Sequence, residues 1–193
     1  IFDGVSVTRV VLGELVALYN SICAGERSPL EEATAGYGDY ARWEQEWVTE
    51  PRARRRVDHW RERFANLPSA GFPQDRPRPP TPRFRGAAVP LRVAPEAIAR
   101  LRAIGQANSS TLFQVLAALW ALLESRHSGC DDVVFAVAAD LRQRPELEAL
   151  VGYCLTPLPV RVDTSGDPSF AELVVRVRNE LLDGLDNMLP FER

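Results

Sequence analysis

Apolar residues repeat along this 193-residue chain at spacings that distinguish helices from strands. From Val5 to Ile22 they recur every three or four positions, which predicts a helix over residues 5–24 with a broad buried face. Gly25 ends this pattern, as glycine commonly does after a helix. A second run at the same spacing predicts another helix with one aromatic stripe, made by Tyr37, Tyr40, Trp43 and Trp47. We interpret this stripe as core packing or as a clamp against a neighbouring lobe.

Pro51 opens a third predicted helix, because proline is favoured at the first helical position. Six arginines lie on this helix, a number that would suit contact with nucleic acid, but acidic residues are interleaved with them. The whole chain is also acidic, with a formal net charge of −3. We therefore interpret the arginine run as a solvated helix face and expect no nucleic-acid partner.

The second half of the chain begins with alternating strand-like and helix-like patterns. Residues 87–93 predict a strand, and residues 95–106 predict a helix. Residues 111–126 are apolar almost all round, so we expect a central helix that is the most buried element. Ser109 or Ser110 is the expected cap of that helix.

Two short apolar runs and a capping box complete the pattern. Residues 132–138 predict a strand covered on both faces, and residues 158–162 predict a second strand. Ser169 and Glu172 form a capping box that opens a helix ending near Leu185. Strands that alternate with helices predict an α/β fold with a sheet and helices in layers.

A proline-rich stretch separates the two halves. Residues 67–85 contain six prolines, which lack the backbone N–H that a sheet requires. We expect a surface crossover loop here. It is the most plausible internal boundary of the chain, and not necessarily a domain boundary, because each flank alone is short.

Composition removes several kinds of chemistry. All basic residues are arginine, so a Schiff-base lysine and a P-loop lysine are both excluded. His59 and His127 lack Cys, Asp or Glu at metal-ligand spacing, so we expect no metal site. We find no apolar run that approaches the roughly 18 residues of a membrane span, and we therefore expect no membrane partner. Three widely spaced cysteines favour reduced thiols and a cytoplasmic location: Cys23, Cys130 and Cys154.

Local sequence gives little support for nucleophilic catalysis. No G-x-S-x-G elbow occurs, and neither histidine has an evident serine or cysteine partner nearby. His127 follows the apolar helix, where we expect it to cap the helix or to interact with its dipole. His59 is expected on an exposed face. Cys154 could be a reactive thiol, but the role of a small buried hydrophobic residue is favoured.

Eight short motifs occur along the chain in a fixed order. They are Ile1–Ser6 (IFDGVS), Tyr37–Trp43 (YGDYARW), Pro73–Pro79 with Phe84–Gly86, Thr111–Phe113, Ser128–Gly129 with Asp131–Asp132, Arg142–Glu146, Val151–Gly152 and Pro190–Glu192. Together they resemble the condensation domain of nonribosomal peptide synthetases, a member of the chloramphenicol-acetyltransferase-like superfamily.

The resemblance implies how this chain fits into such a domain. Residues 1–193 would form a single lobe, most of the C-terminal half of a two-lobe domain. Asp3 and Gly4 would end the family's HHxxxDG signature, so both signature histidines would precede Ile1. We therefore expect no catalytic residue in this chain and no activity of the chain alone. Asp3 would form a bidentate pair with Arg142 and hold the signature loop without acting on substrate.

The resemblance also implies a reaction and its partners. In the family, the active site is a tunnel between the lobes, and two carrier proteins insert phosphopantetheine arms from opposite faces. An acceptor amine attacks the carrier-bound donor acyl or peptidyl thioester, and an amide forms. The domain itself would bind no cofactor, and its partners would be peptidyl and aminoacyl carrier proteins, the N-terminal lobe and adjacent synthetase modules. The tunnel candidates are Tyr153, Cys154 and Thr156.

A second hypothesis comes from non-catalytic relatives of the family, which recruit tailoring enzymes or dock carrier proteins. Three departures from the family pattern suit this alternative: Cys154 replaces a usual phenylalanine, Thr156-Pro157 replaces Asn-Thr, and Asp186–Met188 replaces His/Asn-Gln-Asp. The retained Asp3, Gly4 and Arg142 favour catalysis by the parent domain.

Overall fold

The computed structural model describes residues 3–67, 74, 76–77, 79–81, 86–142 and 144–190. The expected crossover 67–85 lies largely outside these residues, as do Ile1, Phe2, Phe191 and Glu192 of the first and last motifs. The chain folds into two compact units. The first contains Ile1–Ala65, Val137–Leu158 and Asn187–Arg193, and the second contains Asn66–Ala136 and Pro159–Asp186.

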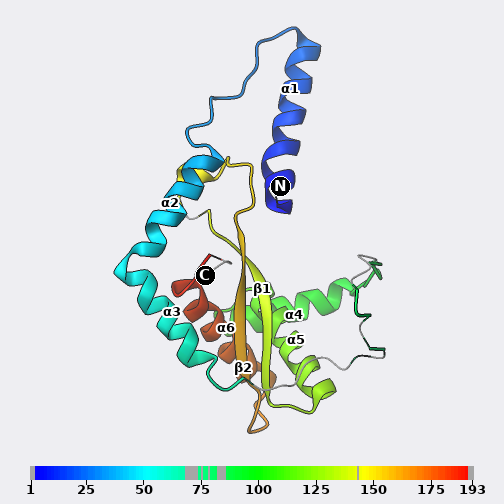
Figure 1. The fold of residues 1–193 in the computed structure, drawn as a ribbon. Coiled ribbons are helices and arrows are strands. Elements are labelled where there is room, and N and C mark those ends of the chain that lie inside the picture. The colour runs from blue at the N-terminus through cyan, green and yellow to red at the C-terminus, as the bar shows by residue number, and fades with distance from the viewer. Residues whose placement is uncertain are drawn as a thin grey trace. The chain divides into compact units, whose positions relative to one another are not determined.

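The helices of the first unit follow the predicted order along the chain (Figure 1). A π-helical turn, η1 (Ser6–Val11), continues directly into α1 (Leu12–Ala24), which Gly25 ends with a left-handed φ of 69°. The arginine-rich helix α3 (Pro51–Arg63) follows α2 (Tyr37–Thr49), with proline at its first position as expected. A 3-10 turn, η2 (Pro145–Leu147), lies near the middle of the segment Val137–Leu158 of this unit.

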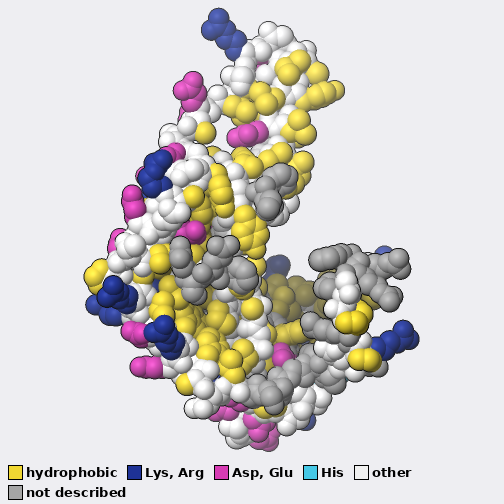
Figure 2. Space-filling view, viewed as in Figure 1, with side chains coloured by type: hydrophobic (Ala, Val, Ile, Leu, Met, Phe, Trp, Pro, Cys, Tyr) yellow, Lys and Arg dark blue, Asp and Glu magenta, His cyan; other side chains and the backbone are white. Residues whose placement is uncertain are grey.

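The first helix buries much less than its sequence predicts. Along Ser6–Ala24, the buried residues are Ser6, Val10 and Ser21. Its large apolar side chains are exposed and form a hydrophobic patch over α1 (Figure 2): Val11, Leu12, Leu15, Val16, Tyr19 and Ile22. The expected broad buried face is therefore wrong for this chain, because no described element of the chain covers it.

The same helix also bears on the membrane question. Ser6–Ala24 is long and apolar enough to cross a membrane by length and composition alone, against the expectation that no such run exists. This evidence is weak, because an apolar helix that packs inside a protein meets the same criterion.

Three helices make up most of the second unit: α4 (Pro95–Ala107), α5 (Leu112–Ser128) and α6 (Phe170–Asp186). The middle helix, α5, packs against both others. The capping box of α6 is confirmed, since Glu172 Oε2 accepts hydrogen bonds from Ser169 N–H and Ser169 Oγ, each at 2.8 Å. The expected cap of α5 is wrong. Thr111 caps this helix by accepting from Gln114 N–H at 3.3 Å, and Ser109 has a positive φ that does not suit an N-cap.

The apolar helix α5 buries one face only. Its buried positions are mostly small: Val115, Ala117, Ala118, Ala121 and Glu124. Most of its large apolar side chains are exposed: Phe113, Leu116, Leu119, Trp120 and Leu123. The helix α6 buries larger residues, Leu173, Val174, Val177 and Leu181. The expectation that residues 111–126 form the most buried element is therefore wrong.

Two antiparallel strands, β1 (Asp132–Asp140) and β2 (Leu155–Asp163), form a two-stranded sheet. Leu141 N–H donates to Cys154 O and Thr164 N–H donates to Asp131 O, each at 2.8 Å, so residue numbers rise along one strand as they fall along the other. The chain thus combines helices with a small sheet, the α/β class that the sequence predicts.

The strands differ from prediction in burial and in number. Alternate residues of β2 are buried from Thr156 to Val162, as in a strand with one covered face. In β1 only Val133 and Ala139 are buried, so the expectation of two covered faces is wrong. Residues 87–93 form no strand, and Val89 and Leu91 are almost fully exposed there. Pro90 lies within this stretch, and proline cannot donate to a sheet.

Candidate functional site

Asp3 and Arg142 form a buried ion pair inside the first unit. Asp3 immediately precedes the first helix, and Arg142 follows β1 by two residues. Their side chains are only 1% and 3% exposed, and Arg142 Nη2 lies 3.2 Å from Asp3 Oδ2. The expected contact between these residues is therefore present, although they lie 139 positions apart in the sequence.

The geometry of this pair differs from the expected bidentate fork. Nη2 alone reaches the Asp3 carboxylate, at 3.2 and 3.4 Å from its two oxygens. Nη1 donates to Asp140 Oδ1 at 3.0 Å, and Nε donates to the Leu150 carbonyl at 3.2 Å. The guanidinium of Arg142 therefore joins three segments of the chain instead of clamping one carboxylate.

The Asp3 carboxylate is fully occupied by donors. Besides Arg142, it accepts from Cys154 N–H at 2.9 Å, from Ser6 N–H at 2.8 Å and from the Ser6 hydroxyl at 3.0 Å. Burial is the largest effect on the pKa of Asp3 and raises it, but the hydrogen bonds from Cys154 and Ser6 and the charge of Arg142 together lower the pKa below 3.8. Asp3 is thus an ionised structural group that cannot contact a substrate.

Ser6 is a site residue that the sequence did not reveal. Its side chain is completely buried, and its hydroxyl accepts from Arg142 Nη2 at 2.7 Å. It also contacts both the N–H and the carbonyl of Gly152. We call Asp3, Ser6, Arg142, Gly152 and Cys154 the Asp3–Arg142 network. The sequence did not assign Ser6 a role, because two of its three partners, Arg142 and Gly152, lie more than 130 positions away.

The neighbouring Gly4, expected to be a required part of the motif, is exposed. A Cβ atom placed on Gly4 meets nothing within 4 Å, so packing in this chain does not demand a glycine there. Gly152 is the opposite case, because a Cβ on Gly152 would run into the ring of Tyr37. The first residue of the aromatic stripe therefore packs directly on the backbone of the network.

The three tunnel candidates differ in accessibility. The Tyr153 side chain is 46% exposed, and the Tyr153 carbonyl accepts from the Tyr37 hydroxyl at 3.0 Å. Cys154 is 1% exposed, and burial raises the pKa of its thiol to about 11, so the role of a buried hydrophobic residue is confirmed. Thr156 is buried as well and donates to the Leu189 carbonyl at 2.8 Å. Of the three side chains, only that of Tyr153 is open to a ligand in this chain.

The two histidines lie outside the network. His127 lies in the last turn of α5, where its Nδ1 is 2.9 Å from the Leu123 carbonyl, as expected for a group at a helix C-terminus. His59 lies on α3 beside the ring of Trp60 and is half-buried, not exposed as expected. Among the residues that the structure describes, no group of three His, Cys, Asp or Glu side chains is placed to bind a metal ion.

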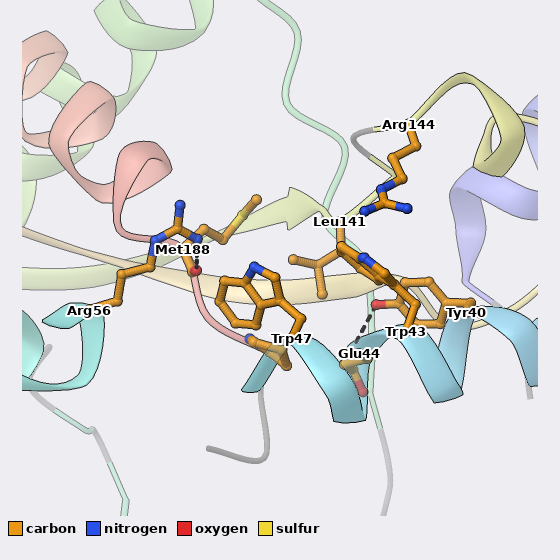
Figure 3. Close-up of a pocket in the computed structure, with 9 residues that line it drawn as sticks. Tyr40, Trp43, Glu44, Trp47, Arg56, Leu141, Arg144 and Met188 are labelled. Carbon is orange, nitrogen blue, oxygen red and sulfur yellow. Dashed lines mark hydrogen bonds between the residues drawn. The ribbon is translucent and has the colours of Figure 1, made fainter. Parts of the chain in front are cut away.

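The aromatic stripe of α2 lines a pocket in the first unit (Figure 3). Tyr40 is buried against Leu147, Leu150 and Cys154, which confirms that the stripe contributes to a core. Farther along the pocket, the guanidinium of Arg144 lies 4.7 Å from the Trp43 ring, and that of Arg56 lies 5.1 Å from the Trp47 ring. These cation–π contacts hold the two arginines against the aromatic wall.

Comparison with known proteins decides the family. Residues 1–193 match the family model of the Condensation domain over the whole chain. The chain belongs to this family. It is 35% identical to malpinin synthetase of Mortierella alpina over 193 residues, which cover 99% of this chain and 2% of that protein. It is also 35% identical to a dimodular nonribosomal peptide synthase of Bacillus subtilis (strain 168) over 198 residues, which cover 99% of this chain and 8% of that protein.

Solved structures give the same fold. The X-domain in its complex with OxyB from teicoplanin biosynthesis matches with a TM-score of 0.84 and 29% identity, over 99% of this chain and 43% of that chain. The resemblance and the α/β fold of the chloramphenicol-acetyltransferase-like superfamily are thereby confirmed. The condensation chain spans a small fraction of the synthetases that it matches and less than half of the X-domain.

Proposed function

We propose that this chain is part of a condensation domain that forms an amide between a carrier-bound donor acyl or peptidyl thioester and an acceptor amine. The observation that carries the proposal is the buried, ionised Asp3, held by Arg142 and by three further hydrogen bonds at the end of the family's signature. This rigid support suits a loop whose task is to present a catalytic group. The proposal keeps residues 1–193 as one lobe of the two-lobe domain.

The proposed reaction is an acyl transfer. The acceptor nitrogen attacks the thioester carbonyl, the C–N bond forms and the C–S bond breaks. The amine loses one proton, and the departing thiolate of the donor arm takes one up. Such a reaction needs a positioned amine, a donor to the developing oxyanion and exclusion of water.

We assign the residues of this chain to positioning. Asp3 and Arg142 hold the signature loop, and neither reaches a substrate because both side chains are buried. Tyr153 remains our candidate for the tunnel wall beside a phosphopantetheine arm, because its ring is exposed on a fixed backbone. The arm belongs to a carrier protein and supplies the thioester. We propose peptidyl and aminoacyl carrier proteins, the other lobe and adjacent synthetase modules as partners.

A cytoplasmic location is part of this proposal. All three cysteines are free thiols: Cys23 is exposed, Cys130 is half-buried and Cys154 is buried. Free thiols are typical of a reducing compartment.

The test uses the parent synthetase with its donor carrier loaded with an acyl group and its acceptor carrier loaded with an amino acid. We expect the mass of the acceptor arm to increase by the acyl group, and we expect Arg142→Ala to slow this transfer. Arg161→Ala is the matched control, because it removes a different arginine–aspartate pair, with Asp132, where the two side chains are 2.6 Å apart. Arg142→Lys serves if the alanine variant does not fold.

The similarity to an X-domain solved in complex with OxyB supports a second candidate, a domain of the same fold that binds another protein. In that case the loaded parent synthetase would form no amide, either as the wild type or as the Arg142→Ala variant. Amide formation that depends on Arg142 but not on Arg161 would exclude a purely docking role.

A further inference from the structure

Ser6 lies where three separate segments of the first unit meet. Its hydroxyl is within hydrogen-bond distance of Asp3 on its own segment, of Arg142 after β1, and of Gly152 before β2. The residue is completely buried, so water cannot replace any of these partners. Like the side chains of Asp3 and Arg142, the Ser6 hydroxyl therefore links its own segment directly to the other two segments of the network.

The Ser6 hydroxyl uses its full capacity to donate and accept hydrogen bonds. A serine hydroxyl has one hydrogen to donate and can accept two hydrogen bonds. It accepts from Arg142 Nη2 at 2.7 Å and from Gly152 N–H at 3.2 Å. Its own hydrogen can go to Asp3 Oδ1 at 3.0 Å or to the Gly152 carbonyl at 2.9 Å. Alanine, the closest side chain in size without a hydroxyl, has neither the donor nor the acceptor sites.

The segment that Ser6 holds is also the one that presents Tyr153. Both polar backbone groups of Gly152 contact the Ser6 hydroxyl, and Asp3 fixes the N–H of Cys154. The Tyr37 hydroxyl holds the carbonyl of Tyr153 between them. The backbone on each side of Tyr153 is thus fixed relative to Asp3 and Ser6, at the end of the family's signature.

We propose that Ser6 is a positioning residue of the condensation site. Its hydroxyl fixes the start of the first helix against segment 150–154, and this holds the signature loop in register with the wall that Tyr153 forms. Ser6 does not contact substrate. The expected effect of Ser6 on the rate of amide formation rests on the proposed function. The link between the start of the first helix and segment 150–154 rests on the observed contacts alone.

The experiment compares Ser6→Ala with Ser21→Ala in the whole parent synthetase. Ser21 is a matched control, because it is a buried serine on the same helix whose hydroxyl bonds only to the Ala17 carbonyl within that helix. We expect Ser6→Ala to lower kcat about 10-fold to 100-fold, the scale of a small misplacement of reacting groups. KM for the acceptor carrier should stay within about twofold, since no carrier contact is removed. Ser21→Ala should leave both constants within about twofold of the wild type.

Hydrogen exchange supplies a readout that does not need activity. The amides of Gly152 and Cys154 should exchange faster in Ser6→Ala and at wild-type rates in Ser21→Ala. If the wild type is active and Ser6→Ala has an unchanged kcat, Ser6 is structural only and the inference is overturned. If the wild type forms no amide, the proposed function fails, while unchanged exchange at Gly152 would still overturn the link itself. Ser6→Cys, which weakens both donor and acceptor, replaces the alanine variant if that variant does not fold.

Discussion

The carboxylate of Asp3 stabilises the folded chain only while it is ionised. Its pKa is lower when folded than the ordinary 3.8, so this stabilisation is fully present above pH 3.8 and is lost as the pH falls through the folded pKa. We expect Asp3→Asn to lower the free energy of unfolding at pH 7 by about 3–5 kcal/mol, as for a buried pair that loses one charge. Urea unfolding of both proteins from pH 7 to pH 2.5 should show this difference shrinking below pH 3.8. A difference that does not depend on pH would mean that folding leaves the pKa of Asp3 unshifted.

A glycine is required at position 152 because there is no space for a side chain, and not because the backbone adopts a conformation that only glycine allows. Because a Cβ atom there would overlap the Tyr37 ring, we expect Gly152→Ala to lower the free energy of unfolding by about 1–3 kcal/mol. Gly38→Ala is the control, since its Cβ would meet nothing within 4 Å. In a Tyr37→Ala background the cost of Gly152→Ala should fall, and a double-mutant cycle with additive effects would refute this contact as the cause.

Individual site residues were predictable only where a motif marks them. Asp3 and Arg142 come from the family motifs, and the structure places them in contact. The division of the Arg142 guanidinium between Asp3, Asp140 and Leu150 was not predictable, because it depends on backbone geometry at the end of β1. Ser6 ends the first motif, but its role was not predictable, since its contact with Gly152 spans 146 residues.

Among the helices, α5 and α6 should respond differently to truncation of a leucine. Leu173 on α6 is 2% exposed, and we expect Leu173→Ala to lower the free energy of unfolding of the 193-residue chain by about 2–5 kcal/mol. Leu116 on α5 is 44% exposed, so Leu116→Ala should cost well under about 2 kcal/mol. Denaturant midpoints of the two variants provide the measurement. Equal shifts would mean that the exposed face of α5 is covered in solution.

The elements themselves were predicted better than their burial. The positions of α2, α3, α4 and α6 follow from apolar spacing, Pro51 and the capping box, all of which act within one turn. The exposed faces of α1 and α5 could not be predicted, because apolar spacing shows which side chains favour burial and not what covers them. The prediction of a strand over residues 87–93 is wrong for a related reason. These residues have an alternating pattern, but no partner strand for them is present among the described residues.

At the scale of the whole molecule, the exposed apolar faces of α1 and α5 are consistent with a chain that corresponds to only part of a complete condensation-domain fold. The chain aligns with 43% of the X-domain that it resembles in structure. Contiguous apolar surface of the kind seen on α1 is uncommon on a complete monomer and usually marks an interaction site. We expect the rest of the parent domain to cover these faces, so Leu116→Ala should cost more in the parent than in the 193-residue chain.

The same partial coverage leads to a prediction about activity. The 193-residue chain, mixed with loaded donor and acceptor carrier proteins, should form no amide above the rate without protein. The physical reason is that its two histidines lie outside the Asp3–Arg142 network, and Asp3 and Arg142 are buried supports that touch no substrate. Circular dichroism and a cooperative unfolding transition should first establish that the chain is folded. The parent synthetase, assayed in the same way, is the positive control, with product formation followed by the mass of the acceptor arm. Turnover by the short chain would mean that its own residues supply the proton-transfer group, and the assignment of this network to positioning would then be wrong.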